Sequence, residues 1–198
     1  HRVSNNLTSI LGIISLEKQH LHKNQIDPEA VLQDLQNRIK SMATVHHMLM
    51  LGEWGPLNLS EIVYKVTQAA LSNSPISHQI QVTIHSSGTP LLLRSKQAIT
   101  FAVIANELTT NSVKHAFQGR DHGHIQIRIT HKHGEQQAQL EFRDDGPGWP
   151  GDVLKEKWES VGLYLIRTNV LHTLDGELRL YNDGGAVAEI NFPFVPPI

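Results

Sequence analysis

The 198-residue chain contains no cysteine, and this absence narrows the chemistry open to it. Disulfide bonds, thiol catalysis and zinc–thiolate sites are excluded, and a cytoplasmic location is expected. The sequence also lacks an apolar run of membrane-spanning length, so we expect no membrane contact by this stretch of chain. The formal net charge of −2 offers no basic stripe for nucleic acid. The expected class is a globular protein of ordinary composition.

Aromatic residues are few, but histidine is abundant, with thirteen copies. Notable pairs are His46 with His47 and His131 with His133. Neither pair belongs to a set of ligands with the spacing of a known metal site. We therefore expect these side chains to be solvated or packed, and we predict no structural metal.

Apolar residues at alternating spacings of four and three predict two helices at the start of the chain. Asp27 is suited to cap the second helix, and Pro28 suits its first turn. The stripe of the first helix is Val3, Leu7, Ile10 and Ile14, and that of the second is Val31, Leu35, Ile39, Met42, Val45 and Leu49. Because a helical hairpin cannot bury both stripes alone, we expect a homodimer with a four-helix bundle.

The helical pattern is interrupted at Gly52, Gly55 and Pro56, which marks a domain boundary. The predicted units are a helical hairpin over residues 1–52, a linker over 53–56 and a second domain over 57–198. Ser60 is a candidate cap for the helix that opens the second domain.

The segment N-E-L-T-T-N-S-V-K-H-A-F, residues 106–117, predicts a helix with a functional face. Glu107 and Asn111 are four residues apart, and Lys114 follows three residues later, so the three side chains project from one side. A carboxylate, an amide and an ammonium group therefore converge. The apolar residues of the same segment would bury the helix against a sheet.

A β-hairpin is predicted further along, because Ile125, Ile127 and Ile129 alternate with polar residues, as do Leu140 and Phe142. The second strand leads into R-D-D-G-P-G-W, residues 143–149. This motif places a carboxylate at a strand end, followed by a glycine-rich turn that leaves room for a ligand.

The segment S-V-G-L-Y-L-I-R, residues 160–167, places Gly162 at the start of an amphipathic helix. Unpaired amide donors at such a helix start favour a phosphate group. Each motif alone is weak, but their order is informative: a polar helix, an Asp-Gly strand end and then a helix that starts with glycine.

From about Pro56 to Pro193 the sequence resembles the ATP-binding domain of the GHKL ATPases, and specifically that of histidine kinases. Residues 106–117 resemble the N box of that family, D-D-G-P-G resembles its G1 box and V-G-L-Y-L-I resembles its G2 box. The resemblance implies an α/β sandwich in which a mixed sheet carries helices on one face, so the whole chain is expected to be α+β. It also implies ATP and Mg²⁺ as cofactors.

The resemblance implies roles for individual residues. Asn111 would ligate Mg²⁺, and Asp144 would accept a hydrogen bond from the adenine amino group. Glu107 would act as a general base or assist the phosphate. The other residues expected around the nucleotide are Lys114 and His115 near the phosphates, Gly146 and Gly148 in the G1 box, and Gly162 and Leu163 in the G2 box. Residues 149–160 would form a short lid.

The first seven residues, H-R-V-S-N-N-L, resemble the phosphoacceptor motif of the HRxxN-type histidine kinases, a group allied to the HWE kinases. The resemblance implies that His1 receives the γ-phosphoryl group of MgATP and passes it to an aspartate of a response-regulator receiver domain. It also implies an upstream sensory module. Arg2 stands where many other histidine kinases have an acidic residue, which leaves any base near His1 unassigned.

One departure from the family pattern keeps alternatives open. Ala186 follows Gly185 where kinases of this kind often carry a threonine, so a hydroxyl near the adenine end is missing. One alternative is a pseudokinase or phosphotransfer scaffold with weak or no ATP turnover. Another is a GHKL ATPase or serine kinase that forms no phosphohistidine.

Overall fold

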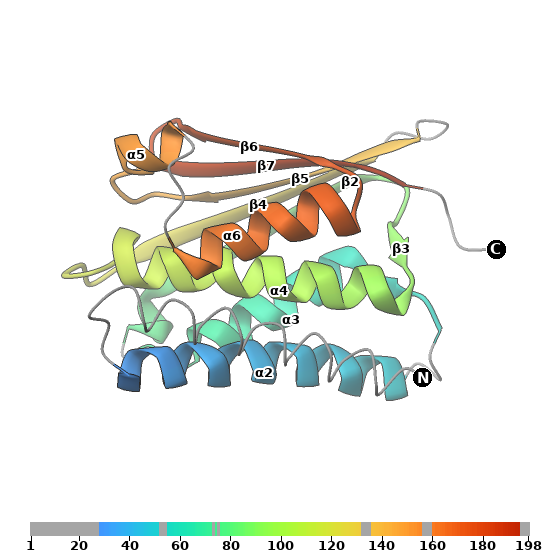
Figure 1. Cartoon of the computed structure of the whole chain (residues 1–198), viewed down its shortest axis with the longest axis horizontal. Coiled ribbons are helices and arrows are strands. Elements are labelled where there is room, and N and C mark those ends of the chain that lie inside the picture. The colour runs from blue at the N-terminus through green and yellow to red at the C-terminus, as the bar shows by residue number, and fades with distance from the viewer. Residues whose placement is uncertain are drawn as a thin grey trace.

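In the computed structural model, the residues described are 28–51, 55–72, 74, 76–131, 136–155 and 160–194. They form an α+β fold, in which one sheet covers a layer of helices and the helix α2 lies beneath that layer (Figure 1). The predicted fold class is confirmed. The first helix of the predicted hairpin lies outside the described residues, and the four-helix bundle remains a prediction.

The main sheet has five strands in the order β2-β4-β5-β7-β6. β2 pairs with β4 in parallel, and the other neighbours are antiparallel, so the sheet is mixed as predicted. The predicted hairpin is the pair β4–β5, in which Ile127 lies opposite Phe142. The strands are β2 (Ile80–Gly88), β4 (Gly123–His131), β5 (Gln137–Asp144), β6 (Glu177–Asn182) and β7 (Ala186–Pro193). A small second sheet pairs β1 (Leu57–Asn58) with β3 (Leu92–Leu93).

Alternation along the strands separates an apolar face of the sheet from a polar one. Ile125, Ile127 and Ile129 of β4 are buried against the helices. On the other face, one row across four strands consists of charged residues. In this row Glu141 of β5 lies opposite Glu189 of β7, and each carboxylate is paired with an arginine of its outer neighbour strand, at 3.1 Å from Arg128 and 3.5 Å from Arg179. The arginines offset the repulsion between the two facing carboxylates.

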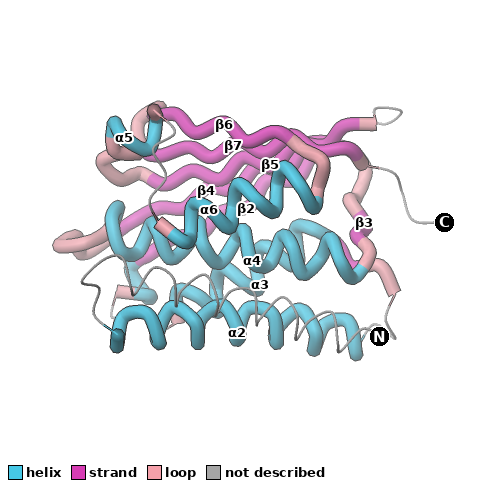
Figure 2. Tube along the Cα trace, viewed as in Figure 1, coloured by secondary structure: helices cyan, strands magenta, loops and turns pink. Residues whose placement is uncertain are grey.

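The helices α2, α3, α4 and α6 lie on one face of the sheet, whereas the short α5 lies beside β6, as Figure 2 shows. The helices are α2 (Pro28–Leu51), α3 (Leu59–Leu71), α4 (Ser95–Asn111), α5 (Gly151–Leu154) and α6 (Val161–Thr168), with short turns η1 (Ser77–Gln79), η2 (Ser112–Ala116) and η3 (Asn169–Thr173). α4 is buried on nearly every side because it lies among the sheet, α2, α3 and α6. Its Phe101 ring meets that of Phe192 on β7 at a centroid distance of 4.9 Å. No helix in the described part of the chain could span a membrane.

The helix α2 begins at Pro28, as predicted, and packs against α3 and α4. Met42, Val45 and Leu49 of its predicted stripe are buried there. Ile39 of the same stripe is 42% exposed in the single chain, whereas the neighbouring Arg38 is buried. A part of the apolar stripe is therefore buried within this chain, and its core is continuous with that of the sheet domain.

The start of α3 differs from the prediction in detail. Its cap is Asn58, whose side-chain oxygen accepts a hydrogen bond from the Ser60 backbone N–H at 3.0 Å. An Asn carbonyl serves as well as a Ser hydroxyl at this position, so the helix starts one residue after Asn58. The predicted boundary at residues 53–56 remains a prediction.

Candidate nucleotide-binding site

Asp144, at the end of β5, is buried and held by three hydrogen bonds. Its Oδ1 accepts the backbone N–H groups of Gly146 at 3.0 Å and Ala186 at 3.2 Å. Its Oδ2 accepts the hydroxyl of Ser112 at 2.8 Å. A carboxylate offers about four acceptor positions, so three donors leave one position for a further donor.

Glycines allow the backbone to close tightly around this carboxylate. A Cβ atom on Gly146 would lie 2.3 Å from the Ala116 Cβ, and one on Gly185 would lie 1.8 Å from the Asp144 carbonyl oxygen. Gly148 has a φ of 91° and touches the Asn182 side chain. The turn after β5 therefore needs glycine, and the role of Gly146 and Gly148 in ligand binding remains a prediction.

Arg143 fixes the neighbouring turn between β6 and β7. Its guanidinium group donates to the Asp183 carbonyl at 2.7 Å and to the Asp183 carboxylate at 2.6 Å. The hydrogen bond and charge of Asp183 raise the pKa of Arg143. Partial burial, followed by the negative charge of Glu141, raises the pKa of the nearby Tyr181 phenol. The two contacts between Arg143 and Asp183 hold the β6–β7 turn against the end of β5.

The carboxylate of Glu107 does not face open solvent. Both it and the guanidinium group of Arg38 on α2 are buried, and they form two hydrogen bonds, from Nε to Oε1 at 2.6 Å and from Nη2 to Oε2 at 2.9 Å. Next to this pair, the Ser41 hydroxyl donates to the Asn106 Oδ1 at 2.6 Å. In this conformation Glu107 is a partner of α2, and its predicted catalytic role remains a prediction.

Asn111 ends α4 one turn after Glu107, and its side-chain amide is available to a ligand. Its Nδ2 atom is buried without a hydrogen-bond partner in the described part of the chain. Gly162 at the start of α6 lies nearby: a Cβ atom there would be 2.8 Å from the Glu107 Oε2 and 3.9 Å from the Asn111 Oδ1. Unpaired buried amides are uncommon in proteins and suggest an absent ligand.

At the start of α6, one backbone amide donates to a capping side chain, and two backbone amides come before it. The Ser160 hydroxyl accepts the Leu163 N–H at 3.3 Å, so Leu163 donates within the protein. The amides of Val161 and Gly162 precede the first hydrogen bond of the helix. α6 packs on α4, which brings Gly162 to the same region as Glu107 and Asn111, as predicted from the order of the motifs.

Two predicted phosphate-side residues are exposed. The Lys114 ammonium group forms an ion pair with Asp34 of α2, with N–O distances of 2.6 and 2.7 Å. His115 is exposed on the turn η2. His1 lies outside the described residues, as do 156–159 of the predicted lid, whose described part includes α5.

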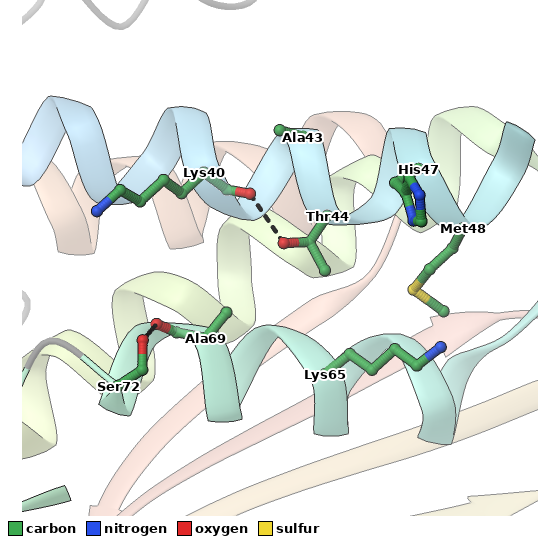
Figure 3. A pocket seen from close by; sticks show the side chains of 8 residues that line it. All are labelled: Lys40, Ala43, Thr44, His47, Met48, Lys65, Ala69 and Ser72. Carbon is green, nitrogen blue, oxygen red and sulfur yellow. Dashed lines mark hydrogen bonds between the residues drawn. The ribbon is translucent and has the colours of Figure 1, made fainter.

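A separate groove lies between α2 and α3, on the side of α2 away from these residues. It has a volume of about 510 Å³ and is lined by Lys40, Ala43, Thr44, His47, Met48, Lys65, Ala69 and Ser72 (Figure 3). None of the predicted nucleotide residues lines it. The candidate nucleotide-binding site is therefore the region around Asp144 and Asn111, outside this groove.

Sequence reasoning missed three residues that contact the predicted ones, namely Asp34, Arg38 and Ser112. The position of Arg38 in the sequence could have indicated its burial, because it lies three residues after Leu35 and four before Met42 on the apolar stripe. A charged residue on an apolar stripe indicates a buried partner. Ser112 adjoins Asn111 in the N box, but its partner lies 32 residues further on.

The mixed sheet, the carboxylate at its strand end and the polar face of α4 define a domain of the GHKL ATP-binding class. Residues 96–196 match the family model described as histidine kinase-, DNA gyrase B- and HSP90-like ATPase, and residues 1–74 match the model described as histidine kinase. The chain belongs to the sensor histidine kinases, and the resemblance to kinases allied to the HWE group is confirmed.

Similar proteins carry the same description. The sensor histidine kinase PdtaS of Mycolicibacterium smegmatis is 26% identical over 98% of this chain and 38% of its own length. A blue-light-activated histidine kinase of Brucella anthropi is 25% identical over 74% of this chain and 28% of its own length. The chain thus spans well under half of the curated relatives it matches.

Solved structures share the fold. The histidine kinase domain of the Erythrobacter litoralis EL346 blue-light activated histidine kinase has a TM-score of 0.68 at 21% identity, covering 81% of this chain and 75% of that one. The mycobacterial sensor histidine kinase MprB has a TM-score of 0.55 at 18% identity, covering 72% of this chain and 98% of that one. At these identities the likeness concerns the fold alone.

Proposed function

We propose that this chain is the kinase core of a two-component sensor that transfers the γ-phosphoryl group of MgATP to His1. The observation that carries the proposal is the buried Asp144 carboxylate, which keeps one acceptor position at the end of β5. An exocyclic amino group of adenine is a donor that fits this position. Membership of the histidine kinase family supports the choice of acceptor.

The residues present fit a magnesium ion bound together with ATP. Mg²⁺ usually takes only one or two protein ligands, with phosphates and waters completing its shell. Asn111 is the residue that would hold it, through the side-chain Oδ1, because Mg²⁺ takes oxygen ligands. When bound, Mg²⁺ neutralises charge on the phosphate oxygens.

The rest of the site would orient the substrate. Asp144 binds the base, the free amides at the start of α6 bind phosphate oxygens, and Lys114 and His115 add polar groups on the phosphate side. A ring nitrogen of His1 forms a bond to the γ-phosphorus, while the bond from that phosphorus to the ADP oxygen breaks and ADP leaves with the electron pair. The phosphoryl group then passes to an aspartate of a receiver domain.

The contact between α2 and α4 determines which role Glu107 can have in the reaction. Glu107 is not free to act on the substrate while both of its oxygens accept hydrogen bonds from Arg38, since these bonds occupy its lone pairs. Either Glu107 orients groups without accepting a proton, or α2 moves away from it during the reaction. The homodimer and the upstream sensory module belong to the same proposal.

The test is autophosphorylation with γ-labelled ATP and Mg²⁺, followed by treatment of the labelled protein with acid and with base. We expect acid-labile label in the wild type, none in His1→Gln, and a loss of at least about a hundred-fold in Asn111→Ala and Asp144→Asn. His78→Gln, at an exposed histidine on η1, is the matched control and should retain full label.

The same experiment separates the alternatives. Acid-stable label would indicate a serine kinase, and label that survives His1→Gln would place the acceptor elsewhere. A wild type that binds ATP, remains dimeric and incorporates no label would support the scaffold.

A further inference from the structure

Ser112 is the first residue after α4 and is 2% exposed. Its Oγ lies 2.8 Å from the Asp144 Oδ2 and 3.2 Å from the Leu108 carbonyl oxygen. The single hydroxyl proton can be given fully to only one acceptor, and the shorter contact to a charged carboxylate is the stronger. Among the described residues, Ser112 provides the one side-chain donor to Asp144.

The turn η2 gives Ser112 this position. It is a wide π-helical turn over Ser112–Ala116, closed by the hydrogen bond from the Phe117 N–H to the Ser112 carbonyl at 2.9 Å. Such turns are often found at functional sites. At Oδ1, the other oxygen of Asp144, the backbone N–H of Ala186 donates a hydrogen bond. The side chain of Ala186 has no hydroxyl to add a second one.

We propose that Ser112 is the positioning residue for nucleobase selection, providing from the N-box helix the hydroxyl that is absent at Ala186. The proposal rests on the proposed function, in which ATP is the substrate. Two backbone amides occupy the acceptor positions of the Asp144 Oδ1, and the Ser112 hydroxyl occupies one of the two at Oδ2. The remaining lone pair of Oδ2 therefore has a fixed direction. A base must bring an N–H donor to it: the amino group of adenine fits, whereas the carbonyl oxygen of guanine is repelled.

The test is equilibrium binding to the full chain of two ligands that differ only in this donor, MgATP and the magnesium complex of purine riboside triphosphate, which lacks the amino group. We expect Ser112→Ala to weaken ATP binding roughly ten-fold and to change binding of the other ligand by less than about two-fold. Discrimination between the ligands therefore decreases. The matched control is Thr100→Val, at a buried hydroxyl of α4 that bonds only to the Lys96 carbonyl among the described residues.

The outcomes are distinct. Equal weakening of both ligands by Ser112→Ala would show a structural role alone and overturn the proposal, as would unchanged binding of both. These two results leave the proposed function intact, because the wild type still binds ATP. A wild type that binds neither ligand would overturn both proposals. Thermal unfolding of each variant shows whether a loss of binding reflects a loss of the fold.

Discussion

At the scale of single residues, Gly146 is a position next to Asp144 where a side chain is poorly tolerated. A Cβ atom there would lie 2.3 Å from the Ala116 Cβ and 2.7 Å from the Ala116 Cα, so backbone would have to move. This turn also presents the Gly146 N–H to the carboxylate. A change at Gly146 thus affects both the packing of the turn on η2 and the orientation of Asp144.

We expect Gly146→Ala to reduce the free energy of unfolding by about 1–3 kcal/mol, the range for overpacking. It should also weaken ATP binding. Gly151→Ala is the control, since a Cβ atom at Gly151 would meet nothing within 4 Å, and its effect should stay within about 0.5 kcal/mol. Denaturation in urea measures both variants, and equal stability of the two would contradict the expected clash.

The local motifs made part of the site predictable. Asn111, Asp144 and the glycines are recognisable because each acts within a short segment whose residue types and spacing are informative. Ser112 was missed because a serine in a helix commonly bonds to its own preceding turn, as its contact with Leu108 shows. Only the packing of α4 against β5 shows that Asp144 is the closer partner.

At the scale of elements, α2 and α4 are joined by polar contacts that lie within an apolar interface. The buried Arg38–Glu107 pair is flanked by the Ser41–Asn106 hydrogen bond and by Met42 and Val103, which pack together with α6. A buried charge is costly when its partner is removed. The pair therefore fixes how α2 lies along the N-box helix.

We expect Arg38→Met to lower the free energy of unfolding by about 3–5 kcal/mol, because it leaves the Glu107 charge buried and without its main partner. The double variant Arg38→Met/Glu107→Gln should lose less than the sum of the two single variants, because the uncompensated charge is gone. Denaturant unfolding of the four proteins gives this coupling.

The control for that cycle is Lys65→Met. Lys65 pairs with Glu61 four residues earlier on α3, and both side chains are about half exposed, at 47% and 52%. An exposed pair of this kind is worth no more than about 0.5 kcal/mol. A loss at Lys65 as large as that at Arg38, or strict additivity of the Arg38 and Glu107 changes, would contradict a buried, coupled pair.

Elements were predictable where one residue type determines the pattern. Pro28 marks the start of α2, and the isoleucines of β4 fix which of its faces is buried. The orientation of α2 was not fully predictable, because Arg38 and Ile39 both fit a three-four spacing and hydrophobicity favours Ile39. The burial of Arg38 depends on Glu107, 69 residues further along the chain. The periodicity of α2 gives no information about this partner.

At the scale of the whole molecule, the predicted boundary at residues 53–56 does not divide the apolar core. Val45, Met48 and Leu49 of α2 belong to the same cluster as the residues of α3, α4 and the sheet. We therefore expect the described part of the chain to unfold in one cooperative transition.

Leu49→Ala should lower the free energy of unfolding of the ATP-binding domain by about 2–5 kcal/mol, because Leu49 is fully buried. Leu51→Ala, two residues later on the same helix, changes a side chain that is 72% exposed and should have an effect below about 0.5 kcal/mol. Hydrogen exchange of amides in β4 and β5 reports the change within the sheet. Unchanged exchange in Leu49→Ala would mean that α2 and the sheet unfold independently.

The shared core of α2 and the sheet domain has a consequence for exchanging parts between kinases. A chimera joined at residues 53–56 would place a foreign helix over α4, and that helix would have to present a cation opposite Glu107, a hydroxyl opposite Asn106 and an anion opposite Lys114. A chimera joined before Pro28 transfers all three matching groups together. The transferable module is therefore the ATP-binding domain with α2 attached, and recombination should succeed more often at its start than at the apparent linker.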